Sequence, residues 1–398
     1  MRIDGGFQDD AGLAQVADML RKGGHQALIV GGAVRNRLLG LPASDLDLAT
    51  DAPPDRVIGL ARTAGLKPVP TGIDHGTVTV IADGCPYEIT TFRRDVDTDG
   101  RHAVVAFSDR IEDDARRRDF TMNAIYATPE GEVIDPVGGL PDLQNRHLRF
   151  VGDPATRIAE DYLRILRYFR FLAWYTDPRQ PPDPAALRAC AQGAPGLSRI
   201  SRERIGAEMR KLLSAPDPSA AIGLAAEAGV LQEILPGADP AALPPLVALE
   251  HGLAPDWLRR LVALGGKDPT DALRLSRAES RRWHDLSRAV TAGWPAAVAG
   301  YRLGDGQGES AVLIAAARHG VDLPPGWRGQ VARGAAAAPL PLTGADLSDH
   351  LSGPALGRGL RAAEKLWIAS DFSADRDALI AAATRPRKAE PGENGGMP

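Results

Sequence analysis

The chain has 398 residues, 44% of them apolar, and a formal net charge of −4 at neutral pH. This length allows two or three domains with cores of their own, and no apolar run approaches the roughly 18 residues of a membrane span. The N-terminus lacks the layout of a signal peptide, and Cys85 and Cys190 form no disulfide or zinc motif. We therefore expect a cytoplasmic protein with no membrane partner. The charge does not indicate nucleic-acid binding, nor does it exclude a local basic groove.

The first 150 residues predict a mixed unit of helices and strands. The predicted elements are a helix over 12–23, a strand over 26–30, a strand that carries Asp45 and Asp47, a helix from Pro53 to about Gly65, and strands over 77–81, 87–92 and 147–151. Asp83-Gly84 is a hairpin signal, and a second hairpin is expected to turn at Glu130-Gly131. Residues 94–110 are charged and lack an apolar pattern, so they predict a mobile loop.

From residue 153 onward the pattern is helical. Residues 153–175 predict one amphipathic helix, with a polar face formed by Arg157, Glu160, Asp161, Arg164 and Arg167. By itself such a face indicates an ordinary row of salt bridges. Further helices are predicted at 203–213, 218–229, 271–292 and 354–369, with no strand among them. Residues 385–398 are rich in Pro, Gly and charge and are predicted to be disordered.

The stretch 28–50, LIVGGAVRNRLLGLPASDLDLAT, has the strongest functional pattern. Alternate residues of a strand share a face, so Asp45 and Asp47 project together, and two adjacent carboxylates repel unless a hard cation such as Mg²⁺ lies between them. Gly31 and Gly32 let the backbone approach an anion at a helix N-terminus, and Arg35 adds a positive charge. The pattern indicates phosphates and a divalent metal, whereas Asp-x-Asp alone would indicate only a solvated strand end.

Two weaker patterns leave alternatives open. Glu88 stands among apolar residues of a predicted strand, either as a third member of the carboxylate site or as a solvated edge residue. His251 with His284-Asp285 faintly suggests a metal phosphohydrolase site, but His284-Asp285 lies in an ordinary helical pattern.

An ordered set of motifs supports a family resemblance. The segments are GGAVRN…DLD, PTGIDHGTVTV, YEITTFR, RRDFTMNA, IDPVGG…DL…LRFVGDP, EDYLRILRYFRF and PLTGADL…GPALG. Together they resemble the bacterial class II tRNA nucleotidyltransferase and poly(A) polymerase family. The resemblance implies an α+β fold with a polymerase-beta-like nucleotidyltransferase head of mixed sheet (1–150). It also implies an all-helical neck with a base-recognition helix (151–215), and a helical body and tail that bind tRNA (216–384).

The implied reaction is attack of an RNA 3′-hydroxyl on the α-phosphate of CTP or ATP, with two metal ions and release of pyrophosphate. The HGTVTV segment and the position of residues 94–110 are similar to those of enzymes that add CCA to tRNA 3′ ends. Alternatives are a poly(A) polymerase, or a relative that adds only CC or only A. A more remote alternative is an inactive tRNA-binding protein. The resemblance does not indicate an oligomeric state.

The resemblance also implies roles for individual residues. Asp45 and Asp47 would bind Mg²⁺, with Glu88 as third ligand or proton acceptor. Phosphate and ribose contacts would come from Gly31, Gly32, Arg35, Arg118, Asp119 and Asn123, of which Asp119 and Asn123 could instead brace the fold. Where the family commonly has Asp, this chain has Asn36.

Base selection can be argued from hydrogen-bonding chemistry. Asp161 would accept from the amino group of cytosine or adenine, and Arg164 would donate to the adjacent ring nitrogen. Uracil and guanine present the reverse polarity and would leave buried groups unpaired, at about 1–3 kcal/mol each. Arg167 and Arg170 would steady this pair or reach phosphate.

Overall fold

The computed structural model describes residues 1–3, 7, 9–42, 45–98 and 103–385. The chain forms two compact units, one of Met1–Pro240 with Gly266–Leu275 and the other of Ala241–Gly265 with Ser276–Pro398. The first unit contains both the predicted head and the predicted neck, and the boundaries at 150 and 215 remain predictions. Among the described residues, no helix is long and apolar enough to cross a membrane.

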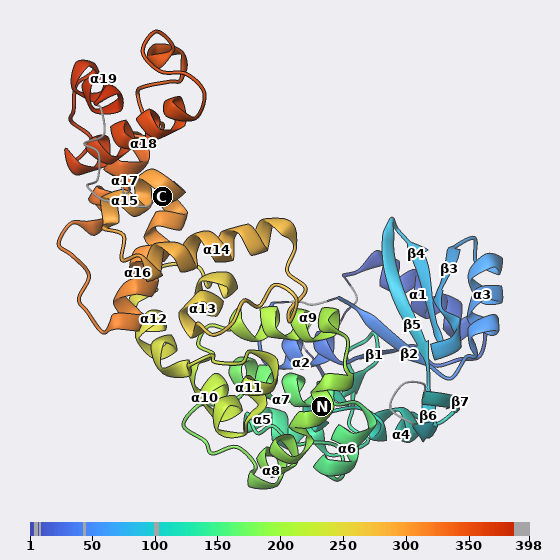
Figure 1. Cartoon of the computed structure of the whole chain (residues 1–398). Helices are drawn as coiled ribbons and strands as arrows, with labels where there is room; N and C mark the ends of the chain where they lie inside the picture. The colour runs from blue at the N-terminus through green and yellow to red at the C-terminus, as the bar shows by residue number, and fades with distance from the viewer. Residues whose placement is uncertain (4–6, 8, 43–44, 99–102, 386–398) are drawn as a thin grey trace, which may run out of the picture. The chain divides into compact units, whose positions relative to one another are not determined.

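A seven-stranded mixed sheet organises the N-terminal part of the first unit (Figure 1). Its strands lie in the order β3-β4-β5-β2-β1-β8-β9, and only the β2–β5 pair is parallel. The bounds are β1 Leu28–Val30, β2 Asp47–Thr50, β3 Lys67–Gly72, β4 Thr77–Ala82, β5 Cys85–Thr91, β8 Tyr126–Ala127 and β9 Val133–Ile134. The predicted hairpin at Asp83-Gly84 and the one at Glu130-Gly131 are both confirmed.

Helices α1 (Ala11–Lys22) and α3 (Pro54–Thr63) lie together on one face of this sheet (Figure 1). The Tyr87 hydroxyl donates to Asp10 Oδ1, the N-cap of α1, at 2.5 Å. Fully buried Leu48 and Ile89 pair in register with each other, with Ile89 on the same side of β5 as Tyr87. Since side chains alternate along a strand, Glu88 faces away from α1.

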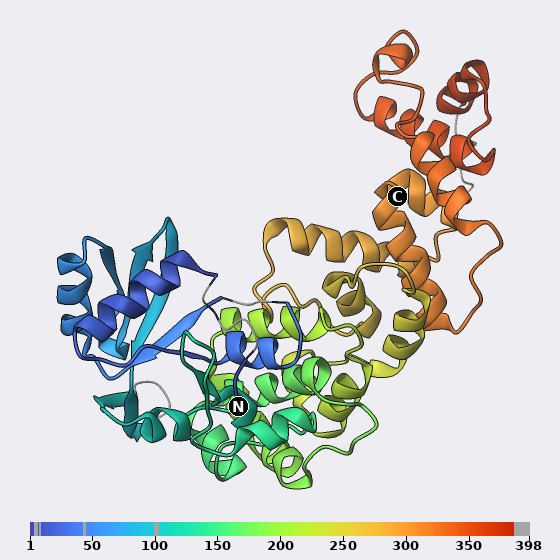
Figure 2. The same cartoon turned by 180° about the vertical axis from the view of Figure 1, so that it is seen from behind.

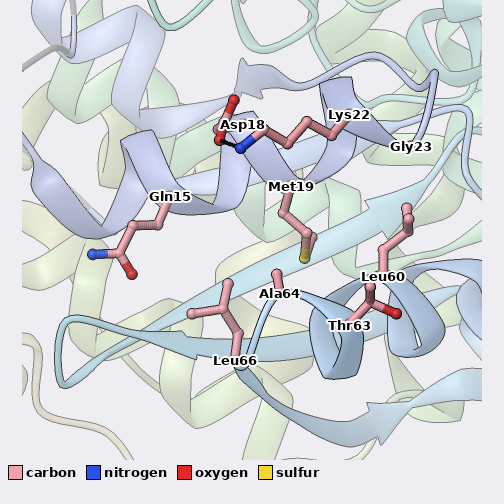
Figure 3. Close-up of a pocket in the computed structure, with 9 residues that line it drawn as sticks. All are labelled: Gln15, Asp18, Met19, Lys22, Gly23, Leu60, Thr63, Ala64 and Leu66. Carbon is pink, nitrogen blue, oxygen red and sulfur yellow. Dashed lines mark ion pairs between the residues drawn. The ribbon is translucent and has the colours of Figure 1, made fainter.

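A pocket of about 430 Å³ lies between α1 and α3 (Figure 3). Met19, Leu60 and Leu66 form its apolar part, and the Asp18–Lys22 ion pair lies at its rim. The two helices that line it cover the sheet face opposite to Glu88, so this pocket is separate from the predicted carboxylate site.

The other face of the sheet packs on the segments that follow β5. Ala49 and Tyr126 share a buried cluster there with Phe92, Ala115 and Val151. Helices α2 (Gly32–Leu38), α4 (Ile111–Arg116) and α5 (Gly139–Gln144) complete this region. Helix α2 contacts α7 (Leu163–Tyr175) through the hydrogen bond of Arg35 to the Tyr175 hydroxyl, and it lies close to the green helices in Figures 1 and 2.

All later regular structure in the described residues is helical, as predicted. In the first unit the helices are α6 Pro154–Glu160, α7 Leu163–Tyr175, α8 Pro184–Gly193, α9 Arg202–Leu213, α10 Ser219–Glu227 and α11 Val230–Ile234. In the second unit they are α12 Leu243–Leu249, α13 Trp257–Leu264, α14 Arg277–Thr291, α15 Ala296–Leu303, α16 Asp305–His319, α17 Trp327–Ala336, α18 Pro354–Ala369 and α19 Arg376–Thr384.

The core of the second unit depends on close backbone approach and on one buried ion cluster. A Cβ atom at Gly334 would lie 1.8 Å from the Ala297 carbonyl oxygen, so only glycine lets α17 pack this closely on α15. Glu250, 4% exposed, accepts from Arg259 at 2.6 Å and from Arg260 at 2.9 Å. Removing one partner of such a buried cluster would leave an uncompensated charge.

The structure corrects the predicted mobile loop at 94–110. Residues Arg93–Thr98 (β6) and Ala103–Phe107 (β7) form a separate antiparallel two-stranded sheet, and residues 99–102 lie outside the described part. The valines of AVVAF have high strand propensity, which outweighed the charge of the flanking segment.

Three other predicted elements were wrong in extent. The strand at 147–151 is a single bridge between Phe120 and Phe150. The helix predicted at 271–292 begins at Arg277, because Ser276 and Glu279 form a capping box. The helix predicted at 153–175 breaks at Asp161, whose φ of −151° and ψ of 104° are extended. The predicted disorder of 385–398 falls, beyond residue 385, outside the described residues.

Candidate active site

The register of β2 and β5 places two of the predicted carboxylates side by side. Asp47 and Glu88 are direct neighbours in the parallel pair, and both are exposed on the face that points away from α1. Asp45 precedes the strand, which begins at Asp47 and not, as predicted, before both aspartates. Partial desolvation raises the pKa of Asp47, and the charges of Glu88 and Asp45 raise it further, whereas Arg118 acts in the opposite direction. The negative charge concentrated here would be relieved by a cation.

Asp45 and Asp47 fit a divalent metal by their chemistry. Both supply hard oxygen donors, and the repulsion from Glu88 and Asp45, which adds to desolvation in raising the pKa of Asp47, is what a cation would relieve. Across the described part of the chain, however, no three or more His, Cys, Asp or Glu side chains gather in a way that could hold a metal ion. Glu88 is therefore adjacent to the pair without completing a three-carboxylate group, and His251, His284 and Asp285 form no metal site either.

Arg118 faces the glycine turn and the carboxylates. Its guanidinium pairs with Asp114 at 2.9 Å and donates to the Tyr126 hydroxyl at 3.1 Å. A Cβ atom on Gly31 would lie 3.8 Å from Arg118 Nη1. Gly31 has a φ of 74° and a ψ of −126°, a backbone conformation that glycine adopts without strain, and Gly32 then begins α2. Arg118, Gly31 and Gly32 are thus brought together next to Asp47.

Asp114 fixes the position of Arg118. Burial of the carboxylate would raise its pKa, but Arg118 and Arg117 outweigh this effect and lower the pKa of Asp114 to about 2. For Arg118, burial acts to lower the pKa and Asp114 raises it, with a net increase. Asp114 is 1% exposed, so the Asp114–Arg118 ion pair is well shielded from water.

Arg35 is buried and joins α2 to α7. Its guanidinium donates to Asn123 Oδ1 at 2.6 Å, to the Tyr175 hydroxyl at 2.8 Å and to Asn36 Oδ1 at 2.9 Å. It also lies 3.9 Å from the centre of the Tyr175 ring. Burial lowers the pKa of Arg35 to about 10. Its predicted contact with the triphosphate remains a prediction, since these protein groups take up its donors here.

Asn36 has two hydrogen-bonding roles that one carboxylate could not fill. Its Oδ1 accepts from Arg35, and its Nδ2 donates to the Pro42 carbonyl at 3.1 Å. The second bond ties α2 to the connection that leads to Asp45. The departure from the family pattern therefore removes a charge beside Arg35 and adds a donor for Pro42.

A second set of predicted residues joins the 119–123 segment to α7. Asp119 Oδ2 accepts from Arg167 Nε at 2.7 Å, and its Oδ1 accepts from the Phe120 backbone and from Asn123. Burial would raise the pKa of Asp119, but Arg167 in particular holds it below its usual value. Arg170 forms an ion pair with Glu208 of α9 at 2.7 Å.

The predicted base-reading pair lies at the break between α6 and α7. Asp161 Oδ2 accepts from Arg204 Nη2 at 2.6 Å. Arg164 pairs with Glu160 and donates to the carbonyls of Arg157, at 2.7 Å, and Arg117, at 3.0 Å. Each member is thus held by its own partner, and the two side chains belong to different local environments instead of one helix face.

Comparison with known proteins identifies the fold family. Residues 27–149 match the model of the poly A polymerase head domain, and residues 182–242 match a probable RNA and SrmB-binding site of polymerase A. The solved CCA-adding enzyme of Bacillus stearothermophilus in complex with CTP has a TM-score of 0.68 and 29% identity, covering 93% of this chain and 95% of that one. The chain therefore contains a poly A polymerase head domain and is similar in fold to a CCA-adding enzyme. The predicted α+β nucleotidyltransferase fold is thereby confirmed.

Curated relatives match over a shorter stretch. The human mitochondrial CCA tRNA nucleotidyltransferase 1 is 43% identical over 203 residues, 51% of this chain and 47% of the relative. The CCA-adding enzyme of Geobacillus thermodenitrificans is 40% identical over 259 residues, 65% of this chain and 58% of the relative. The chain thus spans about half the length of the curated relatives that it matches. Nucleotidyltransferases of this family generally need a divalent metal.

Several supporting residues of this nucleotidyltransferase fold were missed by the sequence reasoning. Asp114 stands three and four positions before Arg117 and Arg118, a helical spacing that could have indicated the ion pairs. Tyr175, Arg204 and Glu208 carry no such signal, because their partners are distant in the sequence.

The Asp114 ion pair predicts a loss of stability in acid. Because the folded-state pKa is depressed, its contribution is complete above the unfolded pKa of about 4 and disappears as the pH falls toward 2. We expect Asp114→Asn to lower the free energy of unfolding by about 3–5 kcal/mol at pH 7, and by progressively less between pH 4 and 2. Urea unfolding at several pH values measures this, with Asp18→Asn in an exposed pair as control. A pH-independent difference would contradict the assignment.

The roles of Asn36 predict an order of stability among its variants. Asn36→Ala leaves donors of buried Arg35 unpaired and should cost about 1–3 kcal/mol. Asn36→Asp loses the Pro42 bond but gains an ion pair with Arg35, so we expect it to remain within about 1 kcal/mol of the native protein. Chemical denaturation of the three proteins compares them. An Asp variant as unstable as the Ala variant would show that the Pro42 bond dominates.

Proposed function

We propose that this protein adds CCA to the 3′ ends of tRNA, transferring CMP and AMP from CTP and ATP to the RNA 3′-hydroxyl with release of pyrophosphate. The observation that carries the proposal is the likeness, over 93% of the chain, to a CCA-adding enzyme solved with CTP. The relatives named as CCA-adding enzymes and the ordered motifs of the sequence support it. The tRNA and nucleotide partners belong to this proposal, and the cytoplasmic location remains a prediction.

Asp45 and Asp47 would hold the metal, which we propose to be Mg²⁺. When bound, the metal would stabilise negative charge on the attacking and leaving oxygens. Glu88, beside Asp47 and facing the same side, is suitably placed to accept the proton of the RNA 3′-hydroxyl. Arg118 would contact phosphate, because Asp114 directs its guanidinium toward the turn at Gly31. The electrostatic contributions of Arg118 and the metal would balance the negative charge of the triphosphate.

Asp119 and Asn123, together with the arginines of α7 that contact them, would orient the substrate. Asp119 and Asn123 are joined to each other, to Arg167 and to Arg35, so a ribose contact from either would be held rigidly. Arg167 and Arg170 would brace the helix that follows the base-reading residues. We propose that Arg204 orients the Asp161 carboxylate and that Glu160 orients Arg164, which leaves an acceptor and a donor to read the edge of cytosine or adenine.

A direct test uses a tRNA transcript that lacks its 3′ CCA. With CTP, ATP and Mg²⁺ we expect addition of C, C and A followed by arrest, seen on a denaturing gel. Asp47→Asn should reduce the rate by roughly a hundredfold or more, since it removes a metal-binding carboxylate.

Other products of this assay would indicate a different function. Long A tracts on any RNA would indicate a poly(A) polymerase, and arrest after C, C or incorporation of A alone would indicate a partial relative. Unaltered tRNA binding without incorporation, unchanged by Asp47→Asn, would indicate an inactive binding protein.

Base selection has its own test at Asp161. A full reversal of the Asp161 and Arg164 charges would place Arg beside Arg204 and Asp beside Glu160, so a single neutral change is cleaner. In Asp161→Asn the amide can turn to donate to uracil O4, and we expect the preference for CTP over UTP to fall by about tenfold or more. The ratio of kcat/KM values measures this, with Asp177→Asn as control for a half-buried, arginine-paired carboxylate. An unchanged ratio would exclude Asp161 as the base reader.

A further inference from the structure

A second polar cavity lies where the end of the head meets α6. It has a volume of about 480 Å³, and the residues that matter for its chemistry are Arg116, Thr121, Arg149, Gly152, Thr156 and Arg157. None of the carboxylates at Asp45, Asp47 or Glu88 lines it. The cavity is therefore distinct from the proposed catalytic face, and three arginines are among the residues that line it.

Two of these guanidinium groups are fixed by protein partners. Arg149 Nε donates to Asp142 Oδ2 at 2.9 Å, and Asp142, 9% exposed, also accepts from the Thr121 hydroxyl at 2.5 Å. Arg157 Nη1 donates to the Arg116 carbonyl at 3.0 Å, and its Nη2 pairs with Glu160. These contacts hold the side chains in place, so an anion that bound between them would meet preorganised donors.

The Arg116 side chain is different. It is exposed, and within the described part of the chain its guanidinium has neither an ion pair nor a hydrogen bond. One carboxylate, Asp153, also lines the cavity, but it caps α6 and accepts from the Thr156 backbone at 2.8 Å and the Thr156 hydroxyl at 2.9 Å. Arg116 is thus the cavity arginine that no described residue pairs with, while Asp153 keeps its negative charge and is held by Thr156.

We propose that this cavity binds a backbone phosphate of the RNA substrate, with Arg116 as the contact and Arg149 and Arg157 as its fixed flanks. The inference rests on the proposed function, because it requires an RNA partner. The location supports it, since the Arg157 carbonyl accepts from Arg164, the predicted base reader, at 2.7 Å. If an RNA end reached Arg164, its phosphates would pass close to this cavity, because every nucleotide of the RNA carries one.

Arg116→Gln is the most informative variant, because it removes charge without breaking an ion pair. Arg149→Gln, in contrast, would leave the buried Asp142 without its arginine partner. We expect Arg116→Gln to weaken binding of CCA-less tRNA about three- to tenfold at moderate salt. It should also make the slope of log K against log salt shallower by about 0.7–0.9. Arg116→Lys should keep the slope, and Arg56→Gln, an exposed arginine of α3, should change neither quantity.

The binding and activity measurements distinguish failure of the phosphate site from failure of the proposed CCA addition. If the wild-type protein completes CCA and Arg116→Gln binds tRNA with unaltered affinity and slope, the phosphate site is wrong and the function stands. If Arg116→Gln instead raises the KM for CTP, or the inhibition constant of inorganic pyrophosphate, with tRNA binding unchanged, the cavity serves the nucleotide or its product and the RNA assignment is overturned. If the wild-type protein binds no tRNA, both proposals fail.

Discussion

The geometry of this site depends on several largely buried arginines, each of which must find hydrogen-bond acceptors within the protein. Arginine keeps its charge at all working pH values, so burying it requires acceptors that are already in place. Arg118 meets this requirement with Asp114, and Arg167 meets it with Asp119. Arg35 meets it with uncharged hydrogen-bond acceptors, which include Asn123 and Tyr175. These contacts hold the end of the sheet, the turn at residues 121–123 and helix α7 in one arrangement.

The carboxylate face has the opposite character. Asp45, Asp47 and Glu88 are exposed and bring negative charges close together, which adds to the partial desolvation that raises the pKa of Asp47. The electrostatic free energy of this face is therefore less favourable without a cation than with one. The largely buried arginines, in contrast, find their partners within the protein. The arginine contacts thus maintain the geometry, while the carboxylate face keeps the exposed negative charge that the proposed metal would neutralise.

Much of this arrangement could be predicted from the sequence, for reasons that differ between its parts. The β4–β5 hairpin and the change from strands to helices follow from local patterns, which is why Asp83-Gly84 was informative. The break at Asp161 could not be predicted, because a continuous apolar stripe runs through 153–175 and the break depends on contacts with Arg204 and the 116–118 segment. The partners of Arg35 were also beyond local reasoning, since Tyr175 is remote in sequence. The strands at 93–107 were missed because charge was given more weight than β-propensity.

The parallel pairing of β2 with β5 has a consequence for how the molecule folds. Asp47 and Glu88 are separated by 41 positions (88 minus 47), and the chain between them includes α3, β3 and β4. The β4–β5 hairpin closes over a two-residue turn and can form within microseconds, whereas joining β2 to β5 requires closure of a much longer loop. We therefore expect the carboxylate face to assemble late, after the hairpin has supplied an edge for β2. A folding intermediate with only the hairpin formed would have β4 and β5 paired, but Glu88 would not yet lie beside Asp47.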